Sequence, residues 1–278
     1  EIEEMYKRNQ QKLVLYNLKD SELVLDILEK STLLSLFIRR SALTGLMIDE
    51  VKGSIASLDA LYLKKLRERG YVASSAGHSV KEESIIGGYV MDSIPGLYDN
   101  ILVFDFKSLY PSLMKTFNID PLSFGKKGIK APNGATFSKV KGIMPEIISE
   151  LMDVREEYRK KKDEVGRYAI KILMNSFFGV MASPLCRYYS LDLANAITSF
   201  AQFFIKKTAE MIREEGYEVI YSDTDSCFVV AGKKDPEVLG KELEDKMNGM
   251  LKDFIRSKYY LDSYLHLEFE KVYSKFIM

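Results

Sequence analysis

The segment YSDTDS, residues 221–226, lies between two apolar runs, EVI at 218–220 and CFVV at 227–230. This pattern predicts two strands joined by a tight turn, yet it places Asp223 and Asp225 at the turn, although Asp is depleted in strands. Residues i and i+2 of an extended chain share a face, so the two carboxylates point in the same general direction. A buried carboxylate without a partner costs several kcal/mol. A divalent cation would compensate this charge; two exposed turn aspartates are the alternative.

The composition is that of a globular chain of 278 residues, with 46% hydrophobic and 29% charged residues. Lys plus Arg and Asp plus Glu are equal at 40 each, so any binding of a polyanion must depend on local positive charge. Cys186 and Cys227 match no metal-ligand spacing and are expected to be packing residues in a reducing compartment. The sequence shows no apolar run of the roughly 18 residues that a membrane span needs. We therefore expect a soluble, cytoplasmic protein without membrane contact.

The order of patterns along the chain predicts an α+β fold. Asp20 is expected to cap a helix starting at Ser21, and Pro145 to occupy an N1-like position of a helix. The expected helices are 2–30, 31–70 (broken near LTGLMID), 145–163, 167–181, 191–215 and 235–255; strands are expected at 101–106, on both sides of the turn at 221–226 and at 264–278, and loops at 72–84 and 120–143. Strands that carry carboxylates thus flank an inserted helical hairpin.

Two further motifs accompany the first. Asp105 ends the apolar strand ILVFDF and opens DFKSLYPS, residues 105–112, so its carboxylate is expected at a sheet edge; a helix-capping role is the alternative. In KILMNSFFG, residues 171–179, Lys171, Asn175 and Phe178 are spaced to share one helix face. Each motif alone is compatible with an ordinary solvated or packed residue, but the three together are not easily explained that way.

In this order, DxxSLYPS, KxxxNSxxG and YxDTDS resemble motifs A, B and C of family B DNA polymerases. The segments GGYVMDSIPGLYDNILVFDFKSLYPS and NLKDSELVLDILEKS are similar to the DNA polymerase II subgroup of bacteria and archaea. The resemblance implies a palm with an antiparallel sheet and helices, an inserted helical-hairpin fingers region and an N-terminal helical segment. It also implies DNA synthesis from dNTPs on primer–template DNA.

The resemblance assigns expected roles to individual residues. It implies two Mg²⁺ ions, with Mn²⁺ as a possible substitute, held by Asp105, Asp225 and the carbonyl of Phe106, and Asp223 as a third catalytic acid. The nucleotide-binding residues that it implies are Ser108, Leu109, Tyr110 as the ribose gate, Arg155, Arg159, Lys171 and Asn175; supporting positions are Thr224, Glu268 and Glu270. For Arg155 and Arg159 the alternative is a solvated charged helix, and for the two glutamates a solvated strand face. Phe178 stands where the family usually has Tyr.

The resemblance also implies a division of the chain. It places a helical segment joining an exonuclease region to the palm at 1–80, palm with motif A at 81–143, fingers at 144–187 and palm with motif C at 188–278, without a thumb. Tyr16 and Asp20 resemble a residual exonuclease motif whose partner acids are outside this chain, so no exonuclease activity is expected from it. A fragment of a longer polymerase is expected, and a sliding clamp is a possible partner through regions outside the chain.

Three other functions are compatible with parts of this pattern. A non-catalytic DNA-binding paralogue or subunit would not need the complete acid set Asp105, Asp223 and Asp225. A nucleotidyl cyclase would not need the helix that bears Lys171 and Asn175. A protein-primed relative within family B stays open, although no obvious insertion separates the first two motifs. The acid set favours the polymerase.

Overall fold

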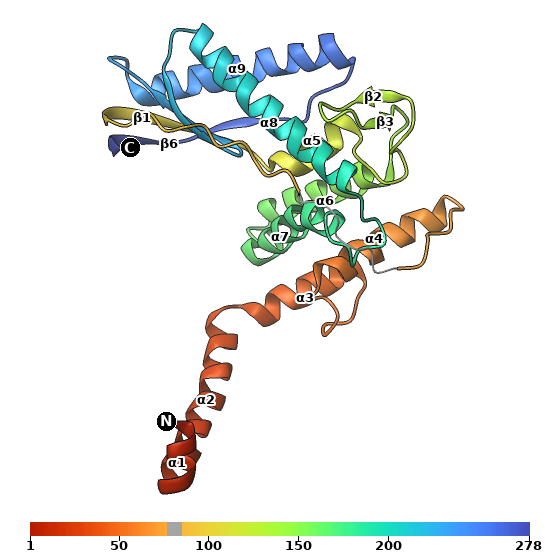
Figure 1. The fold of residues 1–278 in the computed structure, drawn as a ribbon, viewed down its shortest axis with the longest axis vertical. Helices are drawn as coiled ribbons and strands as arrows, with labels where there is room; N and C mark the ends of the chain where they lie inside the picture. The colour runs from red at the N-terminus through yellow and green to blue at the C-terminus, as the bar shows by residue number, and fades with distance from the viewer. Residues whose placement is uncertain (77–84) are drawn as a thin grey trace.

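The computed structural model describes residues 1–76 and 85–278 and has the α+β architecture that the sequence predicts (Figure 1). The helices are α1 (Ile2–Arg8), α2 (Gln10–Lys30), α3 (Leu33–Thr44), α4 (Ser54–Glu68), α5 (Leu109–Phe117), α6 (Ile143–Lys160), α7 (Glu164–Met181), α8 (Leu191–Glu214) and α9 (Pro236–Tyr259). The strands are β1 (Leu97–Phe106), β2 (Gly128–Lys130), β3 (Thr136–Ser138), β4 (Val219–Asp223), β5 (Ser226–Val230) and β6 (Leu267–Ile277). Among the described residues, no helix is long and apolar enough to cross a membrane.

The central feature is a four-stranded antiparallel sheet with the order β4-β5-β1-β6. The apolar run of β1 explains its central place, because Ile101 through Phe104 are buried on both faces of the sheet. Strand β1 begins four residues earlier than the sequence predicts, and its early part pairs with the end of β6. The sheet therefore brings the first and third motifs onto adjacent strands.

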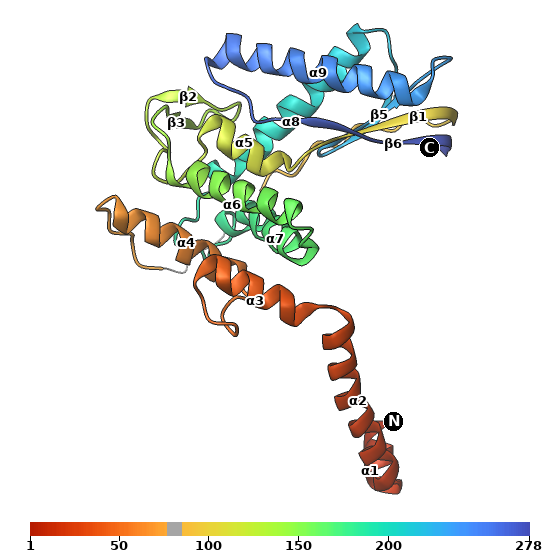
Figure 2. The ribbon, with the colours of Figure 1, turned by 180° about the vertical axis from the view of Figure 1, so that it is seen from behind.

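Two long helices, α8 and α9, cover one face of this sheet (Figure 2). Helix α9 reaches the sheet through Gly240, where an added Cβ would lie 2.5 Å from the ring of Phe269 on β6. Helix α8 carries a continuous buried stripe that includes Phe200 and Phe204, whose rings stack with Phe117 of α5. Cys186 and Cys227 are both buried and free, which confirms the expectation that they are packing residues.

Helices α6 and α7 form the expected helical hairpin, which packs against α5. Helix α6 starts at Ile143 with Gly142 as its N-cap, so the prediction that Pro145 occupies an N1-like position was wrong. The proline lies inside the first turn, where its missing N–H is still not needed by the helix. Asp163 ends the turn between the helices and caps α7 by accepting a hydrogen bond from the Gly166 N–H (2.9 Å).

The segment expected as a loop at 120–143 contains the short β2–β3 hairpin, which the sequence analysis did not find. It is anchored by Asp120, a fully buried carboxylate that accepts hydrogen bonds from the Tyr62 hydroxyl (2.8 Å) and from the Met144 N–H (2.7 Å). The backbone amides of Leu122 and Ser123 donate to the same carboxylate. Asp120 thus ties α4, the segment before the hairpin and the start of α6 together.

The N-terminal helices α1 and α2 project away from the rest of the chain in both views (Figures 1 and 2), and α2 has no buried residue. Asp20 lies in the interior of α2, so the predicted helix start at Ser21 was wrong. The apolar positions at helical spacing simply continue across Asp20. Helices α3 and α4 pack against α7. The organisational boundary predicted at 72–84 falls largely on residues 77–84, outside the described residues.

Candidate active site

Asp105 lies at the end of β1, between its two neighbouring strands. It is opposite Ser226 of β5 and opposite Glu268 of β6. Strand β1 is apolar from Ile101 to Phe104, and the chain turns after the strand at Ser108, which has a left-handed backbone (φ 49°) and precedes α5. The buried strand therefore delivers one carboxylate to the position where the sheet ends and a helix begins.

The turn between β4 and β5 brings Asp225 to the same place. Thr224 adopts a left-handed conformation (φ 50°) that reverses the chain between the two aspartates. Its hydroxyl lies 2.9 Å from Oδ1 of Asp223 and donates a hydrogen bond to it. The backbone N–H of Phe106 donates to the carbonyl of Asp225 at 2.9 Å. This bond joins positions that are more than a hundred residues apart in sequence.

Segment 85–96 holds the Thr224 turn from the other side. The Thr224 N–H donates to the carbonyl of Tyr89 at 2.9 Å. A Cβ at Gly88 would lie 2.5 Å from the Thr224 hydroxyl oxygen, so only glycine permits this close approach without displacing the side chain. The sequence analysis missed the role of Gly88, although the GG pair at 87–88 was a visible signal.

The electrostatic environment of this site raises the pKa of its carboxyl groups. Burial and the nearby carboxylates of Asp225, Glu270 and Glu268 raise the pKa of Asp105 to about 7. Burial also raises the pKa of Asp225, with a contribution from the charge of Asp223. Lys171 acts in the opposite direction on the pKa of Asp105. Three other acidic side chains therefore raise the pKa of Asp105, and Lys171 offsets their effect only in part.

The donor set fits a hard divalent ion only in part. Among the described residues, no three His, Cys, Asp or Glu side chains converge closely enough to hold a metal by themselves. Mg²⁺ in nucleotide-dependent enzymes is usually bound by one or two carboxylates, and water and substrate phosphates complete its octahedron. Asp105 and Asp225, next to the carbonyl of Phe106, offer that smaller set.

A pocket of about 290 Å³ opens beside the motif A turn and is lined by cations of the α6–α7 hairpin. Arg155 and Arg159 line it together, and Nη1 of Arg155 lies 3.4 Å from the Ser108 hydroxyl. Burial and the neighbouring Arg167 lower the pKa of Arg155. A cationic pocket at a helix start suits an anionic ligand.

Arg167 is a site residue that the sequence analysis missed. It lines the same pocket, and its Nε is buried with no hydrogen-bond partner among the described residues. Its Nη1 pairs with Glu164 at 2.7 Å. Because Arg167 precedes Lys171 by four residues, the helical spacing that linked Lys171 to Asn175 was a signal that could have found it.

The second motif contacts the first through two aromatic rings. Tyr110 of α5 and Phe178 of α7 pack with their ring centroids 4.8 Å apart. Burial and the charges of Asp225 and Asp223 raise the pKa of the Tyr110 hydroxyl, which places this ring beside the acids. Lys171 and Asn175 lie on an exposed face of α7, and Leu109 is buried at the start of α5.

The remaining predicted residues are divided between the site and the periphery. Glu268 pairs with Lys107 at 2.5 Å, and both it and Glu270 influence the pKa of Asp105. Tyr16 and Asp20 lie on the exposed surface of α2, which carries them away from these acids (Figure 1). The structure therefore brings the three motifs together and leaves the exonuclease-like pair outside.

Comparison with known proteins agrees with this arrangement. The family model described as DNA polymerase family B matches residues 52–278. The chain belongs to DNA polymerase family B. Family B relatives include DNA polymerase II of Escherichia coli, 36% identical over the whole chain and 37% of the relative, and the DNA polymerase delta catalytic subunit of Arabidopsis thaliana, 30% identical over 96% of the chain and 27% of the relative.

A solved family B DNA polymerase from Pyrobaculum calidifontis has a similar fold, with a TM-score of 0.65 and 25% sequence identity. The similarity covers 97% of this chain and 36% of that one. The chain thus spans about a third of the length of these family B relatives.

Proposed function

We propose that this chain carries the nucleotidyl-transfer centre of a DNA-directed DNA polymerase. In this reaction the primer 3′-oxygen attacks the α-phosphorus of a dNTP and pyrophosphate leaves. The observation that supports the proposal best is the hydrogen bond from the Phe106 N–H to the Asp225 carbonyl, because it joins the strand end that carries Asp105 to the turn that carries Asp225. The arginine-lined pocket opens at Ser108, shortly after this strand end. Membership of family B supports the same conclusion.

The acids are proposed to hold two Mg²⁺ ions, which Mn²⁺ could replace. Asp105 and Asp225 with the Phe106 carbonyl would be the direct ligands, and Asp223 the third acid. Bound metal ions would supply charge stabilisation for the attacking and leaving oxygens. Thr224 orients Asp223 through its hydrogen bond. Glu268 and Glu270 add negative potential at Asp105, which strengthens the attraction for cations.

The triphosphate is proposed to bind in the arginine-lined pocket. Arg155 and Arg159 of α6 and Lys171 and Asn175 of α7 would contact its oxygens, and Arg167 joins this set because it lines the same pocket. The backbone amides of Ser108 and Leu109 lie at the start of α5, where helix N–H groups lack internal partners. This arrangement stabilises negative charge from two sides of the pocket.

Tyr110 is proposed to exclude ribonucleotides. Its ring is fixed by Phe178 and lies beside the acids, so it can occupy the space that a ribose 2′-hydroxyl would need. The hairpin α6–α7 corresponds to the proposed fingers at 144–187, and the sheet with α5, α8 and α9 to the proposed palm at 81–143 and 188–278. Primer–template DNA is the proposed partner; a sliding clamp would act through other regions of a longer polymerase.

The test is primer extension with Mg²⁺ by the chain joined to the remaining regions of a family B polymerase. Replacing Asp225 by Ala should reduce extension on the order of a thousandfold, the size of metal and electrostatic contributions to such reactions. The matched control is Asp99→Ala, at the exposed opposite end of β1, which should extend like the wild type. Unchanged extension by Asp225→Ala would favour a non-catalytic DNA-binding paralogue instead.

A further inference from the structure

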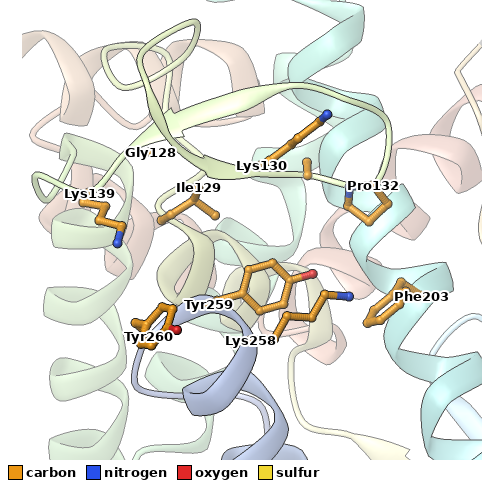
Figure 3. Close-up of a pocket in the computed structure, with 10 residues that line it drawn as sticks. Gly128, Ile129, Lys130, Pro132, Lys139, Phe203, Lys258, Tyr259 and Tyr260 are labelled. Carbon is orange, nitrogen blue, oxygen red and sulfur yellow. The ribbon is translucent and has the colours of Figure 1, made fainter.

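A second pocket lies between the β2–β3 hairpin, α8 and the end of α9. Its volume is about 550 Å³. Figure 3 shows the hairpin above the pocket and the end of α9 below it. The side chains of Tyr259 and Lys258 lie below the hairpin, and Lys258 extends toward Phe203. The residues that carry the argument are Lys130, Lys139, Phe203, Lys258, Tyr259 and Tyr260, called here the lysine–tyrosine pocket.

The pocket concentrates positive charge in a chain whose charges balance overall. Three lysines line it and no Asp or Glu does, although the chain has 40 acidic residues. Two of the ammonium groups lie over aromatic rings: the Nζ of Lys258 is 4.5 Å from the centroid of Phe203, and the Nζ of Lys139 is 5.9 Å from that of Tyr260. Rings do not neutralise a cation, so the lysines stay available to an anion.

Tyr260 is the C-cap of α9, and its N–H donates to the Arg256 carbonyl at 3.1 Å. It ends α9 with φ 59° and ψ 42°, a left-handed position at which glycine or asparagine is usual. Tyr260 is 81% exposed, so its ring is accessible to a ligand. The adjacent Tyr259 is fixed from behind by an edge contact with Phe117.

A smaller hollow lies next to both this pocket and the arginine-lined pocket of the candidate active site. Its volume is about 220 Å³, and it shares Ile129 and Lys139 with the lysine–tyrosine pocket and Tyr264 with the arginine-lined pocket. Nine different lysine and arginine residues line the three hollows, against two carboxylates, Glu156 and Asp262. The result is a basic surface track from α6 to the end of α9.

We propose that the lysine–tyrosine pocket binds a nucleoside polyphosphate, at a site separate from the arginine-lined pocket. The lysines suit the phosphates, and the exposed ring of Tyr260 suits stacking of a base. A volume of about 550 Å³ is in the range of small-ligand sites, roughly 300 to 1,000 Å³. This part of the inference rests on the proposed function: the basic track would raise the local concentration of nucleotide at the active site.

The test is equilibrium binding of dATP to the 278-residue chain in EDTA. An Arg155→Ala/Arg159→Ala variant should lose the dATP that binds in the arginine-lined pocket and keep the dATP that binds in the lysine–tyrosine pocket, because it alters only the former. In that background, Lys130→Ala/Lys139→Ala should weaken dATP binding about tenfold or more. Lys252→Ala, an exposed lysine of α9 outside the pocket, is the matched control and should have no effect.

Tyr260→Gly separates a ligand role from a structural one. Glycine relieves the left-handed strain, so the variant should melt at the same or a higher temperature than its parent while its dATP affinity falls about tenfold. Loss of affinity together with lower thermal stability, or unchanged affinity in both the lysine and the tyrosine variants, would overturn the proposal.

Competing ligands identify what the pocket recognises. Deoxyadenosine should not displace dATP, and inorganic tripolyphosphate should displace it more weakly than dATP itself does. Equal displacement by tripolyphosphate would overturn the nucleoside part of the proposal, and tighter, lysine-dependent binding of an oligothymidylate would overturn it in favour of a single-stranded DNA site. Asp225→Ala should leave dATP binding here unchanged, so failure of this inference is distinct from failure of the proposed polymerase.

Discussion

Replacing Asp105 by Asn should stabilise the metal-free chain at alkaline pH. The pKa of Asp105 is raised from 3.8 to about 7 by burial and by the neighbouring carboxylates. The folded state therefore holds the proton more tightly than the unfolded state. The stability associated with that proton is fully present below about pH 4 and is lost as the pH rises through about 7. Above pH 7 the ionised carboxylate opposes folding, and Asn removes this charge.

The size of the effect follows from the shift in pKa. A shift of roughly 3 units corresponds to about 4 kcal/mol at about 1.4 kcal/mol per unit. Asp105 is partly exposed, so solvent screening reduces the expected value to about 2 kcal/mol. For a chain of 278 residues, that free energy corresponds to a rise in melting temperature of about 3 to 4 °C.

The assay is thermal unfolding in EDTA between pH 4 and pH 9. The Asp105→Asn variant should melt above the wild type at pH 8 to 9, and the difference should vanish near pH 4. Adding millimolar Mg²⁺ at pH 8 should raise the melting temperature of the wild type and leave that of the variant nearly unchanged. Asp99→Asn, on the exposed part of the same strand, is the control without a pH-dependent gain.

Wild-type stability equal to or above that of Asp105→Asn at pH 8 in EDTA would refute this reasoning. Such a result would mean that positive groups of the protein stabilise the ionised carboxylate of Asp105 more strongly than its neighbouring acids destabilise it. A Mg²⁺ response of the same size in both proteins would separately show that Asp105 is not a ligand.

Three further changes test the candidate site and its support. In primer extension, Tyr110→Ala should admit ribonucleotides, and continued exclusion of them would remove the gate role. Gly88→Ala should slow extension about tenfold or more, because the added Cβ displaces Thr224. Gly87→Ala, whose Cβ has open space, should not slow it, and equal rates for the two variants would contradict this role of Gly88. Asp120→Ala should lower the free energy of unfolding by about 3 to 5 kcal/mol in urea, because it leaves the buried Tyr62 hydroxyl and the Met144 N–H without their acceptor; a loss below about 1 kcal/mol would contradict this explanation.

Local chemistry made much of this protein predictable from its sequence. Alternating and helical spacings predicted the strand that ends at Asp105, the strand–turn–strand at 219–230 and the helical hairpin α6–α7. Residue type predicted the acids of the site, because aspartates at the ends of apolar strands have a charge that a bound cation would compensate. These features depend on neighbours within a few residues, and a sequence displays such neighbours directly.

Other features were decided by the tertiary structure. The contact between Phe106 and Asp225 depends on which strands pair and in which register, and that choice is made by burial of the whole sheet. The segment that contains the β2–β3 hairpin is held at both ends by the Asp120 carboxylate, which accepts from Leu122 and Ser123 before the hairpin and from Met144 after it. The lysine–tyrosine pocket depends on where helix α9 ends, at Tyr260. Spacing within one segment carries no information on these long-range contacts, because their free energy exists only when distant segments are packed together.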